Sequence, residues 1–328
     1  MAETNSLVTR FPEVSKVELI GQLLPPPEFT SARFENYKPD PSFISQADAL
    51  KASHAFVKGS KQKLFKKASP APGIYLDGGF GVGKTHLLAS IWHAFAGKKA
   101  YGSFLEYTSL VGYLGFKQSV EALSKFGLVC IDEFELDDPG DTMIMSRLLK
   151  ELEARDVKFA ATSNTPPNAL GSGRFAASDF KREIQGLGSR FNIVSVDGED
   201  FRHRDVSGES ENLSDSELAS WAASKKGCFV DDFEMVLNHL SKMHPTKYRA
   251  LVKDVPALAI SGVRILDDQV DALRLVALID RLYEFQVPLR TSGSIPLTSV
   301  FSDSMIAGAY RKKYLRTVSR IGALTSLP

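Results

Sequence analysis

The most constraining feature of the chain is the stretch GGFGVGKT, from Gly78 to Thr85. It follows the apolar run GIYLD and opens the helical pattern GKTHLLASIWHAFAG, so it predicts a strand, a tight turn and a helix in succession. Glycines let such a turn gather backbone N–H groups, and the start of the helix adds a partial positive charge. The stretch therefore predicts a phosphate-binding loop.

The spacing of this loop matches G-x-x-x-x-G-K-[ST], and it predicts ATP and Mg²⁺ as cofactors. We expect Lys84 to reach the β and γ phosphates and Thr85 to offer its hydroxyl to Mg²⁺. A glycine-rich turn that binds no nucleotide is the alternative, and the flanking strand and helix disfavour it. The expected nucleotide-contacting residues are Gly78, Gly79, Phe80, Gly81, Val82, Gly83, Lys84, Thr85 and His86.

Short apolar runs alternate with helical patterns from Gly73 onward, which predicts buried strands in a mostly parallel sheet covered by helices. The expected fold is therefore an α/β P-loop NTPase. We expect an N-terminal arm over residues 1–70, the P-loop core over 71–206 and a C-terminal α/β and helical region over 207–328. The polar segment 207–220 is the candidate junction. The five apolar runs are GIYLDG, AYGSFLEY, GLVCIDEF, VKFAATSN and NIVSVDG.

Two adjacent carboxylates, Asp132 and Glu133, close the apolar run LVCIDEF. A carboxylate at the carboxyl end of a parallel strand can hold Mg²⁺ through water, and its neighbour can orient and deprotonate the attacking water. The alternative, a merely capped strand end, is disfavoured because a P-loop precedes it. The pair predicts hydrolysis, with Asp132 as a metal ligand and Glu133 as the catalytic base.

The next run, VKFAATSN, ends in Thr162, Ser163 and Asn164 and is followed by the helix-breaking TPP. Alone, this ending is turn chemistry. Beside the carboxylate strand, a polar tip can touch the γ phosphate or the water, as the sensor residue of the AAA+ class does. We therefore expect Asn164 to have a catalytic role.

Three arginines follow without an obvious acidic partner: Arg174, Arg182 and Arg190. In ring ATPases, one such arginine reaches the γ phosphate in the neighbouring subunit and stabilises the charge of the transition state. For each arginine taken singly, a surface salt bridge is the ordinary alternative. An arginine in this role is called an arginine finger, and the sequence does not decide which of the three it is.

Composition argues against several other classes of protein. Forty basic and 39 acidic residues leave a net charge of +1, so no strong signal favours nucleic acid or a membrane surface. Two cysteines cannot make a disulfide framework, and the six histidines show no zinc-ligand spacing. The beginning, MAETNSLVTRFPEVS, has no apolar signal core, and no run of eighteen apolar residues occurs. We expect a cytoplasmic protein without a transmembrane segment.

The order of these motifs resembles the ZapE/Afg-type family of AAA+ ATPases. The most specific parts are DEF with TSNTPP, DFR after the fifth strand, and the late LIDRLYE and RTVSR. The likeness runs from FENYKPDPSFISQADAL to RTVSRI, which is nearly the whole chain. Residue by residue, Gly78 to Thr85, Asp132, Glu133 and Asn164 match the nucleotide motifs of the family, and Arg174 is the first choice for the finger.

The resemblance implies an ATP-hydrolysing homo-oligomer, a hexameric ring, that acts on a protein client. Bacterial members of the family are associated with the cell-division apparatus and its FtsZ ring, so FtsZ is the implied partner. Mitochondrial members are associated with membrane-protein quality control. The absence of a transit-like start favours the bacterial case.

Two other functions stay open at this point. A replication initiator or helicase loader would also carry GKTHLL, but it predicts a DNA-binding helix-turn-helix or a strong basic patch, whereas the C-terminal third has α/β rhythm and balanced charge. A nucleotide-gated scaffold would hydrolyse ATP only slowly and recruit partners by its ATP-bound shape. Turnover with and without a client separates the scaffold from the ring motor.

Overall fold

The computed structural model of this 328-residue chain describes residues 5–61, 73–136, 139–165, 186, 188–199, 212–308 and 310–328. The chain divides into two compact units. We call Lys16–Arg204 the P-loop unit, and Met1–Ser15 together with Asp205–Pro328 the C-terminal unit. These units group the chain differently from the three segments expected from the sequence, because the first fifteen residues belong with the C-terminal region.

The P-loop unit is built on a five-stranded parallel sheet in the order β2-β3-β4-β1-β5. Strand β4 lies between the strand before the P-loop and the strand that ends in Asp132. All strands run the same way, so the polar residues that end β1, β3 and β4 meet at one edge of the sheet. The strands are β1 (Gly73–Asp77), β2 (Lys99–Ser103), β3 (Leu128–Asp132), β4 (Lys158–Ser163) and β5 (Phe191–Ser195).

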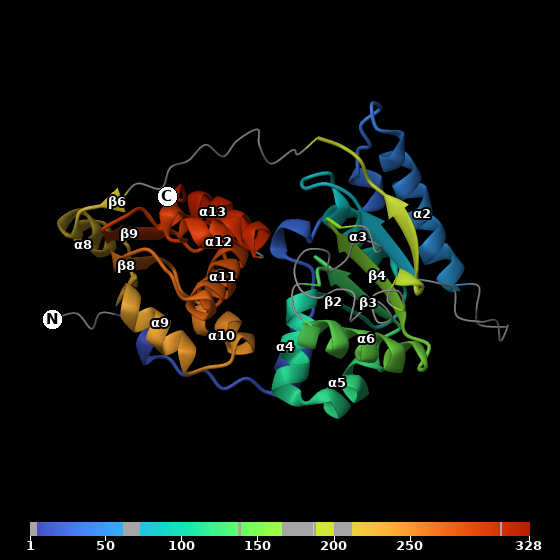
Figure 1. Ribbon diagram of the computed structural model, residues 1–328, viewed down its shortest axis with the longest axis horizontal. Helices are drawn as coiled ribbons and strands as arrows, with labels where there is room; N and C mark the ends of the chain where they lie inside the picture. Colours follow the sequence, from blue (N-terminus) through green and yellow to red (C-terminus); the bar gives the residue numbers. More distant parts are fainter. Residues whose placement is uncertain are drawn as a thin grey trace. The chain divides into compact units, whose positions relative to one another are not determined.

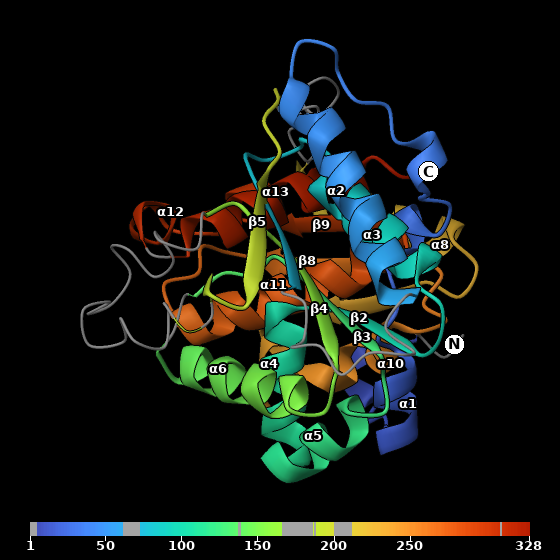
Figure 2. The ribbon, with the colours of Figure 1, turned by 90° about the vertical axis from the view of Figure 1, so that its right-hand side faces the viewer.

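Helices cover this sheet, as the sequence predicted (Figures 1 and 2). Helices α2 and α3 lie along one side, and α4 and α6 lie along the other (Figure 2). On the first side, α3 buries Leu87, Leu88 and Ile91 against residues of the strands. The α/β prediction is therefore confirmed. The α-helices of the unit are α1 (Lys16–Gly21), α2 (Ile44–Lys61), α3 (Lys84–Ala94), α4 (Phe104–Leu114), α5 (Phe116–Leu123) and α6 (Pro139–Glu153).

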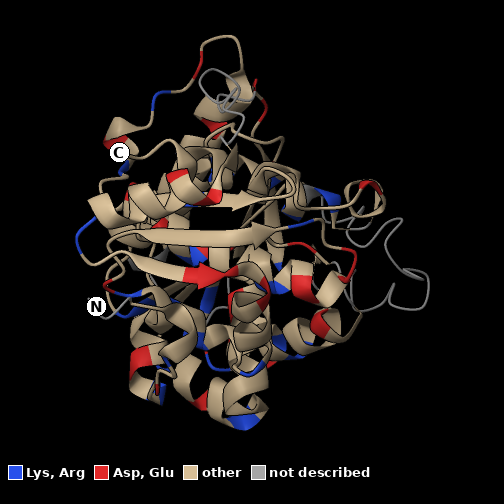
Figure 3. Cartoon of the chain, turned by 90° about the vertical axis from the view of Figure 1, so that its left-hand side faces the viewer, with Lys and Arg blue, Asp and Glu red and all other residues tan. Residues whose placement is uncertain are grey.

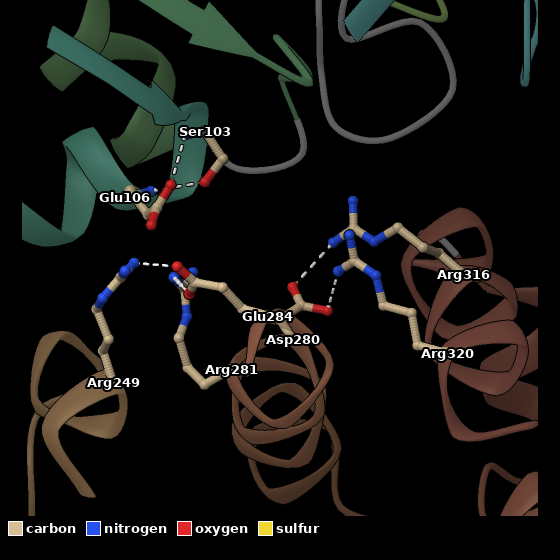
Figure 4. Close-up of polar contacts among 8 residues, drawn as sticks. All are labelled: Ser103, Glu106, Arg249, Asp280, Arg281, Glu284, Arg316 and Arg320. Atoms are coloured by element: carbon tan, nitrogen blue, oxygen red, sulfur yellow. Dashed lines mark hydrogen bonds and ion pairs between the residues drawn. The ribbon is translucent and has the colours of Figure 1, made fainter. Parts of the chain in front are cut away.

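One predicted strand is too long. The run AYGSFLEY was expected to be extended throughout, but β2 ends at Ser103 and Phe104 starts α4. The Ser103 hydroxyl accepts a hydrogen bond from the Glu106 backbone N–H at 3.2 Å, and the Glu106 carboxylate accepts one from the Ser103 N–H at 2.7 Å (Figure 4). This capping box satisfies two backbone donors and begins the helix inside an apolar run.

The C-terminal unit contains a second parallel sheet, of four strands in the order β6-β9-β8-β7. One apolar core joins this sheet to α9, α10, α11 and α13, and a smaller one joins it to α8. Basic and acidic residues are interspersed over the side of the chain drawn in Figure 3. The elements are β6 (Asn212–Leu213), α8 (Asp215–Ser224), β7 (Phe229–Asp232), α9 (Phe233–Ser241), α10 (Tyr248–Val252), β8 (Leu258–Val263), α11 (Gln269–Glu284), β9 (Leu289–Gly293), α12 (Asp303–Ala307) and α13 (Arg311–Thr325).

Two local expectations differ in this unit. The candidate junction 207–220 holds β6 and the beginning of α8 in its described part, because Ser214 and Glu217 form a capping box. The pattern DSMIAGAYRKKYLRTVSRIGAL, expected as one helix, forms α12 and α13, with Gly308 as the C-cap of α12. Glycine is a poor interior helix residue, which favours a break there.

The N-terminal residues belong to the C-terminal unit through contacts with β7. The side chain of Leu7 is almost fully buried in the core of this unit. The Asp231 carboxylate accepts a hydrogen bond from the Leu7 backbone N–H at 2.8 Å and another from the Ser6 hydroxyl at 2.5 Å. The Val230 N–H donates to the Asn5 carbonyl at 2.9 Å. The start of the chain thus covers part of the outer edge of β7, an edge that would otherwise offer open hydrogen-bonding groups.

The two late motifs, LIDRLYE and RTVSR, are joined by ion pairs between α11 and α13 (Figure 4). The Asp280 carboxylate accepts hydrogen bonds from Arg316, at 3.2 Å, and from Arg320. The Arg320 guanidinium also lies 5.2 Å from the centre of the Tyr283 ring. On the same helix, Glu284 pairs with Arg281 and, from α10, with Arg249. The ion pairs of Asp280 and Glu284 therefore link α11 to α13 and to α10.

We expect Asp280→Asn to lower the free energy of unfolding of the C-terminal unit by about 2–3 kcal/mol. The Asp280 side chain is only 17% exposed, so the change leaves two largely buried guanidinium groups without their shared carboxylate. Urea titration followed by Trp221 fluorescence measures this, in a Trp92→Phe background, because the chain has two tryptophans and Trp221 is the one in this unit.

The matched control is Glu234→Gln, which removes the carboxylate of an exposed ion pair with Arg264 in the same unit. That pair is about half exposed on both sides, so its loss should change the free energy by no more than about 0.5 kcal/mol. If the two variants lowered the free energy of unfolding equally, Asp280 would not have the proposed role of holding α11 and α13 together.

Candidate functional site

The loop between β1 and α3 approaches other backbone so closely that two of its glycines cannot be replaced. A Cβ on Gly78 would lie 2.0 Å from the Val196 carbonyl oxygen, at the end of β5. Gly83 has a φ of +91°, and a Cβ there would lie 2.8 Å from the Tyr37 ring. Only glycine tolerates both the left-handed φ and the close approach. The loop is held tightly between β5 and the N-terminal arm.

The Lys84 side chain is folded over the loop and buried. Its ammonium group donates hydrogen bonds to the Gly78 carbonyl at 2.9 Å, to the Gly79 carbonyl, and to Asn164 Oδ1 at 2.9 Å. The last bond connects the P-loop to the tip of β4. The structure therefore brings together two of the predicted site residues, which are 80 positions apart in the sequence.

The Asp132 carboxylate is buried and held by side chains from neighbouring strands. Its Oδ2 accepts a hydrogen bond from the Tyr101 hydroxyl at 2.8 Å, and its Oδ1 accepts one from the Thr162 hydroxyl. The Thr85 hydroxyl lies 3.4 Å from the same Oδ1. The two predicted metal ligands, Thr85 and Asp132, are thus adjacent at the carboxyl edge of the sheet.

Glu133 has an unusual backbone conformation, with a φ of +53°. Its N–H donates to Asp132 Oδ1 and to the Thr162 hydroxyl, both at 3.1 Å. Left-handed backbone is uncommon outside glycine, and such positions persist only where surrounding contacts hold them. Thr162 therefore ties together the turn that carries both carboxylates.

Burial shifts the pKa of two groups around the loop. Burial, and next the neighbouring Asp132 carboxylate, raise the pKa of Tyr101 well above its ordinary value. The Tyr101 hydroxyl therefore stays protonated and remains a donor to Asp132. At the end of β1, burial raises the pKa of Asp77; Lys84 opposes this shift and Asp197 adds to it.

The N-terminal arm packs against the phosphate loop, which the sequence did not indicate. The Tyr37 hydroxyl lies 3.4 Å from the Val82 carbonyl oxygen. His86, one of the expected nucleotide-contacting residues, is directed to the arm: its Nε2 lies 2.9 Å from Asn36 Oδ1 and 3.1 Å from the Arg33 carbonyl oxygen. Because both partners accept, Nε2 carries the proton. Of the other expected residues in the loop, Val82 is buried and Phe80 is partly exposed.

Of the three arginines that are candidates for the arginine finger, the structure describes Arg190. Arg174 and Arg182 lie outside the described residues. Arg190 pairs with Glu153 at the end of α6, and its side chain is 18% exposed. Burial lowers the pKa of Arg190 from its ordinary value. The structure thus has Arg190 in an ion pair within the chain, with a side chain that is largely buried, whereas the alternative expected from the sequence was a salt bridge on the surface.

The residues at this edge of the sheet fit a nucleotide and Mg²⁺. The glycine turn is followed directly by the α3 N-terminus, whose backbone N–H groups suit a phosphate. The hydroxyl of Thr85 and the carboxylate of Asp132 are the oxygen ligands that Mg²⁺ prefers. Over the described ranges, no cluster of three or more His, Cys, Asp or Glu side chains could hold a metal ion by itself.

Within the part of the chain that the structure describes, no helix is both long and apolar enough to cross a membrane.

Comparison with known proteins gives a family match that spans nearly the whole chain. The model of the family described as AFG1-like ATPase matches residues 13–231 and 221–327. "Cell division protein ZapE" of Escherichia coli (strain K12) is 25% identical over 311 residues, covering 79% of this chain and 80% of that protein. "Lactation elevated protein 1 homolog B" of Danio rerio is 28% identical over 178 residues, covering 45% of this chain and 34% of that protein. The crystal structure of DnaI covers 53% of this chain and 93% of its own, at 17% identity and a TM-score of 0.43.

Proposed function

The chain belongs to the AFG1-like ATPase family, and on that premise we propose that it hydrolyses ATP in an ATP-dependent homo-oligomeric ring that acts on a protein client. The observation that carries the proposal is the meeting of three motifs at one edge of the sheet. Lys84 contacts Asn164 at 2.9 Å, and Thr85 lies 3.4 Å from Asp132. A loop with only a structural role would not need these groups at one point: the Lys84 ammonium, the Asn164 amide, the Thr85 hydroxyl and the Asp132 carboxylate.

Each residue then has a distinct task. The backbone N–H groups of the loop from Gly78 to Thr85 would bind the phosphates, with the Lys84 ammonium bonding the β and γ phosphates. Thr85 and Asp132 would hold Mg²⁺, whose charge offsets the charge that develops on the transferred phosphoryl group. Glu133 would orient the attacking water and accept its proton, and Asn164 would contact the γ phosphate or that water.

We propose that a further donor offsets the charge that develops on the transferred phosphoryl group. An arginine from the neighbouring subunit would complete the site, since one guanidinium placed on the transferred group accounts for a large share of catalysis in such enzymes. Arg174 is the first choice. With Arg190 held by Glu153 in its own subunit, Arg182 is the next.

The client is proposed from the relatives. The relative from Escherichia coli is named a cell division protein, and it matches over four fifths of its length. This name supports our proposal that the activity serves bacterial cell division, with FtsZ as the first protein to test. The net charge of +1 and the interspersed charges of Figure 3 supply no strong nucleic-acid signal that would favour the helicase-loader alternative.

The mass of purified Glu133→Gln protein, with and without Mg-ATP, tests the ring. We expect a shift from monomer or dimer to an assembly of about six copies when Mg-ATP is added, because a site completed between subunits links ATP binding to assembly. Multi-angle light scattering at constant protein concentration measures the shift.

Two controls accompany this measurement. Glu133→Gln with Mg-ADP should stay small, because ADP has no γ phosphate for a neighbouring arginine, and Lys84→Ala with Mg-ATP should stay small as well. A particle that remains monomeric while ATP is bound would contradict the ring and leave the nucleotide-gated scaffold as the better proposal.

A further inference from the structure

We propose that Glu135 is a positioning residue that holds the Asn164 amide in one orientation, with its oxygen toward Lys84, and makes the site discriminate between ATP and ADP. The inference rests on the proposed function, because it assigns a regulator to the same site. Glu135 follows Glu133 by two positions, directly after the motif LVCIDEF.

The Asn164 amide lies between two side chains of opposite charge. The Glu135 side chain is buried, with 8% of the residue exposed, and its Oε1 accepts a hydrogen bond from Asn164 Nδ2 at 3.2 Å. On the other side, Asn164 Oδ1 accepts from the Lys84 ammonium at 2.9 Å. One amide therefore joins a carboxylate to the P-loop lysine.

The chemistry of the partners dictates which way the amide lies. An ammonium has only donors, so it must face the amide oxygen, and a carboxylate has only acceptors, so it must face the amide nitrogen. A flipped amide would lose both bonds. Glu135 thereby fixes the orientation of Asn164, and Asn164 in turn restrains Lys84 over the Gly78 and Gly79 carbonyls.

A γ phosphate would be met by the same two residues. Lys84 would turn toward the phosphate, and the amide nitrogen of Asn164 is the group that can donate to a phosphate oxygen or to the attacking water. That nitrogen has two N–H donors, so Asn164 can make this bond with one while Glu135 accepts from the other and keeps the amide oriented. The Glu135 carboxylate also lies two hydrogen bonds from the Lys84 ammonium, so its negative charge opposes a second negative group there. ADP brings only its β phosphate to Lys84, so the affinity for ADP depends much less on Glu135.

The experiment compares Glu135→Gln and Glu135→Ala in a Glu133→Gln background, where ATP is not consumed. Glutamine keeps an oxygen that accepts from Asn164 and removes the charge, whereas alanine removes both. We expect Glu135→Gln to lower the Kd of Mg-ATP by roughly three- to tenfold and to change the Kd of Mg-ADP by less than about twofold. Isothermal titration calorimetry measures both. Glu121→Gln, an exposed position on α5, is the matched control and should change neither.

Turnover separates the hydrogen bond from the charge. With Glu133 intact, Glu135→Ala should lower kcat by roughly tenfold because the Asn164 amide is no longer oriented, and Glu135→Gln should keep kcat within about threefold of the unsubstituted chain. If the alanine variant fails to fold, the ATP and ADP affinities of the nearly isosteric glutamine variant still decide the question.

Three outcomes would overturn the inference. Equal shifts in ATP and ADP affinity would mean that Glu135 only supports the local structure, and unchanged affinities in both variants would mean that it does not act on the site. If the unsubstituted chain failed to bind ATP, or if Lys84→Ala bound it equally well, the proposed function itself would fail and the inference with it. The last result is distinguishable because it needs no change at Glu135.

Discussion

Replacing Lys84 by alanine should weaken ATP binding at least about 100-fold and remove ATP hydrolysis. The ammonium is the one positive side chain that the loop itself supplies, and it is buried among carbonyl oxygens where water cannot substitute for it. Without it, the backbone N–H groups alone face the charge of the triphosphate. Titration with a fluorescent ATP analogue measures affinity, and phosphate release measures turnover.

Lys51→Ala is the control for this substitution. Lys51 lies on α2 in the same unit, and its side chain is 78% exposed, so its loss should leave affinity and turnover unchanged within about twofold. Retained ATP hydrolysis in the Lys84→Ala variant would contradict the assignment of the P-loop. The alanine variant should remain folded, because the buried ammonium is exchanged for a small residue that helices favour.

Much of the site could be predicted because its chemistry is local in the sequence. The spacing from Gly78 to Thr85 specifies a loop geometry by itself, and the end of a buried strand is visible in LVCIDEF and VKFAATSN. Parallel strands bring such ends to one edge. The patterns therefore predict that Lys84, Thr85, Asp132 and Asn164 lie at one edge of the sheet, and the structure has Lys84 in contact with Asn164 and Thr85 beside Asp132.

The residues that the sequence did not indicate act through register and packing. Tyr101 supports Asp132 because β2 lies beside β3, which pairs Ser103 with Asp132. Nothing in the run AYGS distinguishes this tyrosine from any buried aromatic residue. Glu135 lies beyond the motif, and only the turn after β3 directs it to Asn164. Both contacts depend on which strands are neighbours.

The N-terminal region illustrates the same limit at larger scale. Its helices were predictable from periodicity, but not which parts of it would pack on which unit. Leu7 and Ser6 join β7 through Asp231, a residue more than 220 positions away, whereas Tyr37 packs on the phosphate loop. Apolar burial and single buried carboxylates determine which unit each segment packs on, and neither leaves a local pattern in the sequence.

Replacing Glu133 by glutamine should lower kcat by roughly 10²- to 10⁴-fold while ATP binding is retained, since general-base catalysis contributes about that factor. Glutamine has nearly the same shape but cannot accept the proton of the attacking water. The bonds that hold the turn come from the Glu133 backbone N–H, to Asp132 and Thr162, and they do not depend on the side chain. Single-turnover hydrolysis and ATP affinity should be measured on the same preparation.

The matched control for this last prediction is Glu151→Gln on α6, an exposed carboxylate in the same unit that pairs with Arg155. It should hydrolyse ATP like the unsubstituted chain. If Glu133→Gln hydrolysed ATP normally while Glu135→Gln did not, the base would have to be moved to Glu135, because its carboxylate lies within hydrogen-bonding reach of Asn164. If both variants lost ATP binding, the loss would instead point to a damaged turn after β3, because neither substitution removes a phosphate-binding group.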